Sequence, residues 1–218
     1  MTHYNTISES ITHEIIIKKS RFICSVFRIK DEDEGRALIS QIKKEHYKAN
    51  HSCSAMILGE NSEIKRSNDD GEPSGTAGVP ILSVLEKKEL TNTLVVVTRY
   101  FGGIKLGTGG LIRAYSSATS ETLNKANLVT VKEQNGFRIN LTYPQYQLWN
   151  QFLEQHSLNE SDTEFTDNIS TTIYFDPEIK EIISDSLIEY YNGKITFDDI
   201  DAQIIEVPIS TNRTGLSQ

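Results

Sequence analysis

Two glycine-rich blocks constrain this chain more than any other feature of its sequence. Residues 69–80 read DDGEPSGTAGVP and residues 98–118 read TRYFGGIKLGTGGLIRAYSSA, and eight of the 13 glycines lie within them. Glycine loses more conformational freedom on ordering than any other residue, so a cluster this dense indicates backbone that turns to positive φ or approaches something very closely. Charged side chains of both signs stand among these glycines, which is typical of a surface that holds a ligand or a partner.

The composition bounds the size and the compartment of the protein. The chain has 218 residues, of which 37% are hydrophobic, so it can bury a normal core in one large or two small domains. It has no apolar stretch of about 18 residues, and its start lacks the basic and apolar regions of a signal peptide. Cys24 and Cys53 stand in apolar, strand-like surroundings and do not suggest a disulfide. We expect a cytoplasmic protein that does not engage a membrane.

Charge is divided unevenly along the chain. Residues 1–135 carry 18 Lys and Arg against 16 Asp and Glu, whereas residues 136–218 carry 4 against 14. This shift supports a boundary near residues 134–136, and we predict domains at residues 1–134 and 135–218. Because the second of these is strongly acidic, any contact with a nucleic-acid backbone should come from the first.

The hydrophobic pattern of the first predicted domain indicates a mixed β-α-β organisation. The run TLVVVT at residues 93–98 is continuously apolar, as in a strand buried on both faces. Asp31 or Asp33 suits the N-terminal cap of the first helix, and Ile112 falls on the expected inner side of the last. The remaining pattern predicts strands at residues 13–18, 21–29 and 52–58, and helices at about residues 31–47, 80–88 and 109–126.

The second predicted domain has the element order βαββαβ, which is typical of a small ferredoxin-like domain. Pro144 and Pro177 each suit the first turn of a helix. The polar tail after Pro208 is expected to fray. We predict helices at residues 143–155 and 177–192, and strands at residues 137–141, 161–167, 169–175 and 194–205, the last broken near residues 198–201.

The second glycine block follows a buried strand and opens a helix. In that position backbone N–H groups and the helix dipole can receive an anion, and Lys105, Arg99 and Arg113 would add positive charge. The block matches neither the P-loop nor the dinucleotide-binding fingerprint. The alternative interpretation is a glycine turn that only packs the helix on the strand.

The acidic residues of the first block allow three interpretations. Asp69, Asp70 and Glu72 lie so close in sequence that their charges repel unless a cation answers them. They could hold a metal ion through hard oxygen ligands, pair with Arg99 or Arg113 of the other block, or form a solvated acidic turn. We favour the pairing, which would join the two loops, and we expect no resident metal or cofactor.

Candidates for catalysis are weak in this sequence. His46, His51 and Cys53 do not have the spacing of a metal site, and only His51 stands at a strand start near the glycine blocks. Hydroxyl groups of the blocks lack the elbow motif of hydrolases. No catalytic residue can be assigned, and we expect a protein that is not an enzyme.

Three gapless strings resemble the signature of the YigZ/IMPACT family. They are KANHSCSA (residues 48–55), SNDDGEPSGTAGVPIL (residues 67–82) and VVVTRYFGGIKLGTGGLIRAYSSA (residues 95–118). The resemblance covers residues 18–126, and residues 137–207 resemble the second domain of the bacterial two-domain type. The family's motif positions include Gly71, Pro73, Gly75 and Gly78 of the first block. Those that we expect to bind a ligand or partner are His51, Asp69, Asp70, Glu72, Ser74, Thr76, Arg99, Tyr100, Phe101, Gly102, Gly103, Lys105, Gly107, Thr108, Gly109, Gly110 and Arg113.

The resemblance implies an α+β fold and a translation-linked role. The first domain would belong to the superfamily of a small-subunit ribosomal protein domain, the GHMP kinases and domain IV of elongation factor G, and the second would be ferredoxin-like, similar to domain V of that factor. Eukaryotic IMPACT proteins restrain the kinase that phosphorylates initiation factor 2, and they use an additional N-terminal domain to do so. Only about a dozen residues precede the first predicted strand, so we expect that domain to be absent and do not carry the activity over.

The leading hypothesis is a non-enzymatic regulator of translation that binds RNA, the ribosome or a translation factor through the glycine blocks. Arg99, Lys105 and Arg113 would meet phosphate, and Tyr100 and Phe101 would stack on an unpaired base. One alternative is a nucleotide- or other phosphate-binding protein, or an enzyme, that uses Mg²⁺ at the acidic residues. Another is a regulator that contacts proteins alone. The oligomeric state does not follow from the sequence.

Overall fold

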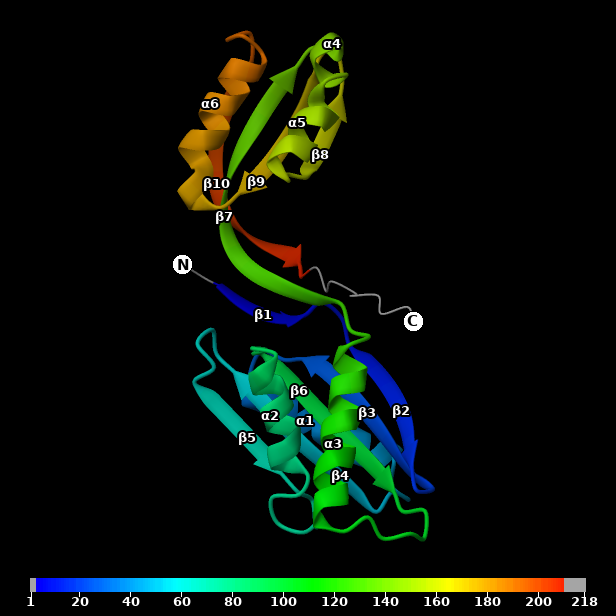
Figure 1. Ribbon diagram of the computed structural model, residues 1–218. Coiled ribbons are helices and arrows are strands. Elements are labelled where there is room, and N and C mark those ends of the chain that lie inside the picture. Colours follow the sequence, from blue (N-terminus) through cyan, green and yellow to red (C-terminus); the bar gives the residue numbers. More distant parts are fainter. Residues whose placement is uncertain (1–2, 210–218) are drawn as a thin grey trace. The chain divides into compact units, whose positions relative to one another are not determined.

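The computed structural model describes residues 3–209, which form a mixed α+β fold in two compact units (Figure 1). The first unit contains the described residues up to Val131 together with those from Glu206 on. The second unit is Lys132–Ile205. The tail beyond Ile209, which was expected to fray, lies outside the described residues.

A five-stranded antiparallel sheet forms the body of the first unit. Its order is β2-β3-β6-β4-β5, and the central strand β6 pairs with both β3 and β4. The acidic and glycine-rich loops therefore follow strands that lie close together in the sheet. The strands are β2 (Ile11–Ile17), β3 (Ser20–Arg28), β4 (His51–Leu58), β5 (Ile64–Asn68) and β6 (Thr93–Tyr100).

Helices cover both faces of this sheet. Val95 and Val97 of β6 belong to the apolar cluster that includes α2 (Gly78–Lys87) and α3 (Thr108–Leu123). The alternate residues Leu94 and Val96 join the cluster beside α1 (Glu32–Glu45) on the other face. Side chains alternate along a strand, so the apolar run expected to be buried on both faces is confirmed. Figure 1 shows α2 and α3 together on one face of the sheet.

The second unit has its own apolar core and most of a second sheet. Strand β7 (Leu128–Leu141) begins in the first unit and pairs with β9 and β10, and β9 pairs with β8. Strand β1 (His3–Ile7), which belongs to the first unit, also pairs with β7. Trp149 and Phe152 are fully buried in the core. The remaining elements are α4 (Tyr143–Tyr146), α5 (Trp149–His156), β8 (Glu160–Phe165), β9 (Ile169–Phe175), η1 (Pro177–Ile179), α6 (Lys180–Tyr190) and β10 (Thr196–Pro208).

The element order βαββαβ expected for the second unit is confirmed, and its strand order is β10-β7-β9-β8. Three details of the expectation were wrong. The helix predicted over residues 143–155 is two helices, β10 runs unbroken to Pro208, and β7 begins nine residues before Phe137. The superfamily assignments of both units and the domain limits at residues 1–134 and 135–218 stay predictions.

Candidate functional site

The two glycine-rich blocks meet at one end of the first sheet. We call residues 69–77 the acidic loop and residues 101–107 the glycine loop. The acidic loop follows β5, and the glycine loop joins β6 to α3 (Figure 1). Strand β4 begins between them, because His51 pairs with Arg99 in the β4–β6 register. The side-chain amide oxygen of Asn50 accepts a hydrogen bond from the Phe101 N–H at 2.8 Å, which ties the glycine loop to the start of β4.

A buried ion pair joins the two blocks. The guanidinium of Arg99 donates to Glu72 Oε1 at 2.7 Å, and the hydroxyl of Tyr115 donates to the same oxygen at 2.8 Å. Glu72 is 8% exposed and Arg99 is 6% exposed. The interpretation that an arginine of the second block answers the acidic loop is confirmed for this pair. Because both charges are removed from water, loss of either partner would leave an uncompensated charge in the interior.

Arg99 is consequently held inside the protein. Its guanidinium carbon lies 5.5 Å from the ring centre of Phe22 and 5.4 Å from that of Phe101, within the range of a cation–π contact. Its Nε has no hydrogen-bond partner among the residues that the structure describes. The buried Arg99 guanidinium therefore has a structural role beneath the site. To bind an external phosphate directly, it would first have to break its ion pair with Glu72.

Asp69 organises the acidic loop through backbone hydrogen bonds. Its carboxylate accepts the N–H groups of Gly75 at 2.8 Å, Ala77 at 3.0 Å and Gly78 at 2.8 Å. Burial alone would raise the pKa of Asp69, but these three N–H donors outweigh it and hold the pKa below its ordinary value. The last two donors open α2, so Asp69 also caps that helix.

The neighbouring carboxylates have separate partners. Asp70 pairs with Lys43 at 2.5 Å and accepts the Ser52 N–H at 2.6 Å, whereas Glu72 pairs with Arg99. Within residues 3–209 no group of three or more His, Cys, Asp or Glu side chains is placed to hold a metal ion. The carboxylates of Asp69, Asp70 and Glu72 therefore stabilise the conformation of the acidic loop through these hydrogen bonds and ion pairs.

His51 has a defined orientation beside the ion pair. Its Nδ1 lies 2.8 Å from the carbonyl oxygen of Asp70. A carbonyl oxygen can only accept, so Nδ1 carries the proton. The other nitrogen, Nε2, lies 3.9 Å from Glu72 Oε2, which is too long for a hydrogen bond. The imidazole is therefore fixed on one side and unengaged on the side that faces Glu72.

Cys53 and Tyr115 lie below the ion pair. Cys53 Sγ is 3.0 Å from the Asp69 carbonyl oxygen and 3.4 Å from the Tyr115 hydroxyl. Burial raises the pKa of the Cys53 thiol to about 12. Burial, together with the neighbouring Cys53 and Glu72, raises the pKa of Tyr115 above its ordinary value. Both groups stay protonated and serve as hydrogen-bonding core residues, Cys53 in β4 and Tyr115 on the buried side of α3, where the helical spacing placed it.

A cavity of about 470 Å³ opens above this network. The ion pair and His51 form its polar side, and apolar side chains form much of the rest. Seven of the residues expected in the site line it, namely His51, Glu72, Arg99, Phe101, Lys105, Gly107 and Thr108. The lining also contains Pro73, a motif position of the first block, together with Asn50, Leu106 and Leu111, which the sequence did not single out.

The other expected site residues lie outside the cavity lining. Thr76 is buried and bonds the Pro73 carbonyl at 2.6 Å, and the Tyr100 hydroxyl lies 2.9 Å from His46 Nδ1. Ser74 and Arg113 are exposed. Those that do not line the cavity are Asp69, Asp70, Ser74, Thr76, Tyr100, Gly102, Gly103, Gly109, Gly110 and Arg113.

Helix α3 begins at the rim of the cavity. Its cap, Gly107, has φ 73° and offers no side-chain bond to the first turn. Gly109 follows in the first turn, where an added Cβ would meet nothing within 4 Å. The fold therefore does not require glycine at position 109, unlike Gly102, where a Cβ would lie 2.0 Å from the Lys19 backbone. A bare backbone at the open start of a helix suits the close approach of an external group.

Several exposed cations surround this end of the unit. The close packing of Gly102 on Lys19 places the β2–β3 turn, with Lys18 and Lys19, beside the glycine loop. Lys18, Lys19, Lys105 and Arg113 are exposed and form no ion pair within the described part of the chain. Lys18 and Lys19 were not among the residues expected in the site. The sequence feature that could have indicated them is Gly102, because a glycine there allows the Lys19 backbone to pack against the glycine loop. Phe101, in the glycine loop itself, is 45% exposed.

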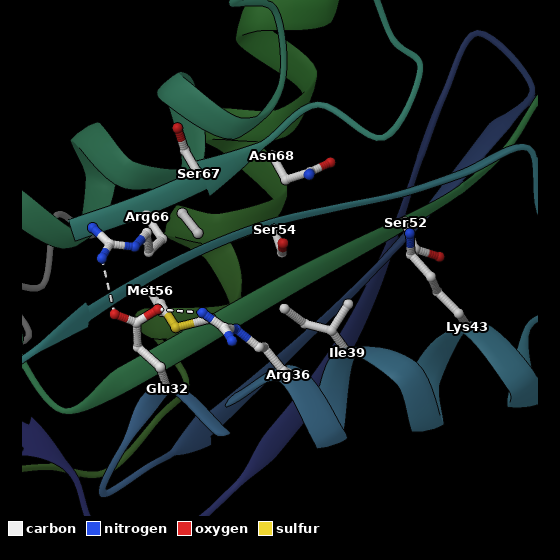
Figure 2. Close-up of a pocket in the computed structure, with 11 residues that line it drawn as sticks. Glu32, Arg36, Ile39, Lys43, Ser52, Ser54, Met56, Arg66, Ser67 and Asn68 are labelled. Atoms are coloured by element: carbon white, nitrogen blue, oxygen red, sulfur yellow. Dashed lines mark hydrogen bonds and ion pairs between the residues drawn. The ribbon is translucent and has the colours of Figure 1, made fainter. Parts of the chain in front are cut away.

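A second cavity, of about 240 Å³, lies between α1 and strands β4 and β5 (Figure 2). Figure 2 shows Glu32 between Arg36 and Arg66, which it pairs with at 2.9 Å each. None of the residues expected in the site lines this cavity. Its cations are already neutralised, so it offers less to a ligand than the cavity between the two loops.

Fold and site together define a two-domain α+β protein with a cavity between two glycine-rich loops. The Impact N-terminal domain matches residues 18–123, and a domain of unknown function (DUF1949) matches residues 139–194. Among residues 3–209, no helix has the length and apolarity needed to cross a membrane.

Relatives extend over nearly the whole chain. The IMPACT family member YvyE of Bacillus subtilis (strain 168) is 45% identical over 195 residues, 88% of each chain. An IMPACT family member of Haemophilus influenzae is 33% identical over 209 residues, 95% of this chain and 99% of the relative. A crystal structure of a hypothetical protein superposes with a TM-score of 0.59 at 27% identity, over 92% of this chain and 98% of that one. The chain therefore belongs to the IMPACT family, which confirms the resemblance.

Proposed function

We propose that this chain is a translation-linked binding protein that engages RNA, free or within the ribosome, through the end of the first unit that carries the two glycine-rich loops. The observation that carries the proposal is a group of four exposed cations in the β2–β3 turn, the glycine loop and α3, none of which forms an ion pair within the described residues. These are Lys18, Lys19, Lys105 and Arg113. Cations without acidic neighbours are free to neutralise phosphates, and an exposed aromatic ring can stack on an unpaired base.

The charge distribution supports the same orientation. Residues 136–218 hold 14 acidic side chains against 4 basic ones, so they repel a phosphate backbone. Contact with RNA then falls to the first unit, and the acidic unit is left to face solvent or protein. The roles of the site residues divide accordingly. Lys105 and Arg113 meet phosphate, and the buried Arg99 and Glu72 hold the loops in place.

The translation link rests on the family and on the architecture. The strand order β10-β7-β9-β8 supports a ferredoxin-like second domain, similar to domain V of elongation factor G. The first domain is proposed to share the superfamily of domain IV of that factor. An alternative that uses Mg²⁺ at the acidic loop is less favoured, because Asp69, Asp70 and Glu72 are each engaged by other groups.

Co-sedimentation with ribosomes and anisotropy with single-stranded RNA across a salt series test this proposal. The test variant is Lys18→Ala/Lys19→Ala/Lys105→Ala. Each phosphate contact contributes about 0.7 to the slope of log K against log salt for a single strand, so the triple variant should lower the slope by about 2.

The matched control removes the same charge elsewhere. Lys30 and Lys87 are exposed, and Lys125 follows α3 at the end opposite the glycine loop. Their triple alanine variant should bind like the wild type. If the folded wild type does not bind RNA or ribosomes at low salt, the proposal is refuted and a protein partner becomes the favoured explanation of the loops.

A further inference from the structure

The cavity between the two loops contains two hydrogen-bond acceptors that face each other without a donor between them. Glu72 Oε2 and His51 Nε2 are 3.9 Å apart. Oε1 of the Glu72 carboxylate already accepts hydrogen bonds from Arg99 and Tyr115, and His51 Nδ1 already donates to the Asp70 carbonyl oxygen. Oε2 makes no hydrogen bond within the described residues, although Glu72 is 8% exposed. Glu72 and His51 both line the cavity, so a ligand that supplies two donors there can engage both acceptors.

We propose that this cavity receives a single unpaired guanine of an RNA strand, with its Watson–Crick edge toward Glu72 and His51. The inference rests on the proposed function and deepens it. Guanine presents an imino N–H and an adjacent amino group on one edge, so it supplies parallel donors to the carboxylate oxygen and to the imidazole nitrogen. Uracil offers a single donor flanked by two acceptors, and these would face the two acceptors of the site.

The floor of the cavity favours such an edge over a phosphate. Glu72 and Arg99 neutralise each other, so the floor has no net charge with which to attract an anion. A phosphate placed there would face the Glu72 carboxylate directly. A neutral ligand that presents hydrogen-bond donors to Glu72 and His51 fits this floor, and nucleobases are ligands of that kind.

The walls of the cavity suit a flat aromatic ring. Pro73, Phe101, Leu106 and Leu111 contribute apolar surface, and the volume of about 470 Å³ falls in the range of small-molecule sites. Phe101 is 45% exposed and stands at the cavity, where its ring can stack on a base that enters from solvent.

The rim provides a place for the phosphate that accompanies the base. Lys105 and Thr108 line the cavity beside the uncapped start of α3. At Gly109 an added methyl group would enter open space, so the glycine leaves room for the strand and is not demanded by packing. The base and its phosphate are thereby received by two separate parts of one site, a neutral floor and a cationic rim.

The test measures the affinity of the full chain for fluorescent oligouridylates that carry one central G, A, C or U. The wild type should bind the G-containing strand at least tenfold more tightly than the all-U strand. Phe101→Ala should reduce affinity for the G-containing strand by at least fivefold. The matched control is Phe165→Ala in the second unit, where Phe165 is 59% exposed, and it should change nothing.

A second variant addresses the cavity without disturbing the ion pair. Thr108→Trp places a large side chain at the rim and should abolish the preference for guanine. Equal affinity of the wild type for all four strands, with salt-sensitive binding retained, would overturn the guanine site and leave the proposed function standing. Failure of the folded protein to bind any strand at low salt would overturn both.

Discussion

The structure makes Asp69 the residue on which the acidic loop depends, and Asp69→Ala measures that dependence. Its carboxylate accepts three backbone N–H groups at 2.8, 3.0 and 2.8 Å. A net contribution of about 1 kcal/mol for each bond, with more for a charged acceptor, predicts a loss of about 3 kcal/mol in the free energy of unfolding of the first unit. Asp69→Asn keeps one carbonyl oxygen, so it should retain the bonds to Ala77 and Gly78 and lose about half as much.

The assay must report on the first unit alone. The single tryptophan, Trp149, lies in the second unit, whereas Cys24 and Cys53 are buried in the first. Thiol labelling across a urea series therefore follows the unfolding of the first unit, and tryptophan fluorescence follows that of the second. Asp69→Ala should shift the labelling transition and leave the fluorescence transition in place.

Acid provides an independent check on the same carboxylate. The pKa of Asp69 in the folded protein is below its ordinary value of 3.8, so its charge stabilises the fold fully above that value. As the pH falls from about 4 through the folded pKa, this stabilisation is lost. The difference between wild type and Asp69→Asn should narrow in that window. The control is Asp33→Ala, whose side chain is 94% exposed and whose free energy of unfolding should stay within about 0.5 kcal/mol of the wild-type value. If Asp69→Ala at neutral pH also stays within about 0.5 kcal/mol of wild type, the reasoning is refuted.

Three further outcomes follow from the same structure. Gly102→Ala should lower the free energy of unfolding by about 2 kcal/mol, because its Cβ would lie 2.0 Å from the Lys19 backbone, and urea titration checks it. Gly109→Ala should instead raise that free energy by about 0.5 kcal/mol through helix propensity while weakening RNA binding, and a loss of stability would contradict this interpretation of the glycine. Burial raises the pKa of both Cys24 and Cys53 to about 12, so neither thiol should react with a disulfide reagent at pH 8 until the unit unfolds, and fast labelling of the native protein would argue against the placement of both residues.

The elements with a strong apolar period could be predicted from the sequence. Strand β9 has the predicted limits, and the first helix begins at Glu32 and is capped by Asp31, one of the two candidate caps. Strand β5 could not be found, because its sequence IKRSN is almost entirely exposed and is held by backbone pairing to β4. Ile112 was expected to face inward and is 39% exposed, because α3 buries the side of Leu111 and Tyr115.

Part of the candidate site could also be predicted from the sequence, because its local patterns are strong. The spacing of the glycines located the two loops, and the need to balance three adjacent carboxylates indicated an arginine partner. The choice of Glu72 for the buried pair depends on how the acidic loop turns around Asp69, which no local pattern encodes. The turn lysines Lys18 and Lys19 lie more than 80 residues before Gly102, so only the folded sheet brings them to the site.

The pairing of β7 with β10 means that the second unit is inserted in the first and is not appended to it. The chain leaves the first unit after Val131 and returns at Glu206, where Glu206 pairs with Arg28 at 2.6 Å and the Ile209 N–H bonds the Leu128 carbonyl at 2.9 Å. A truncation after residue 134 would strip these returning residues from the first unit. Excision of the insert, with a short turn that joins β7 directly to the end of β10, would keep them, so an internal deletion is the cleaner way to obtain the first unit by itself.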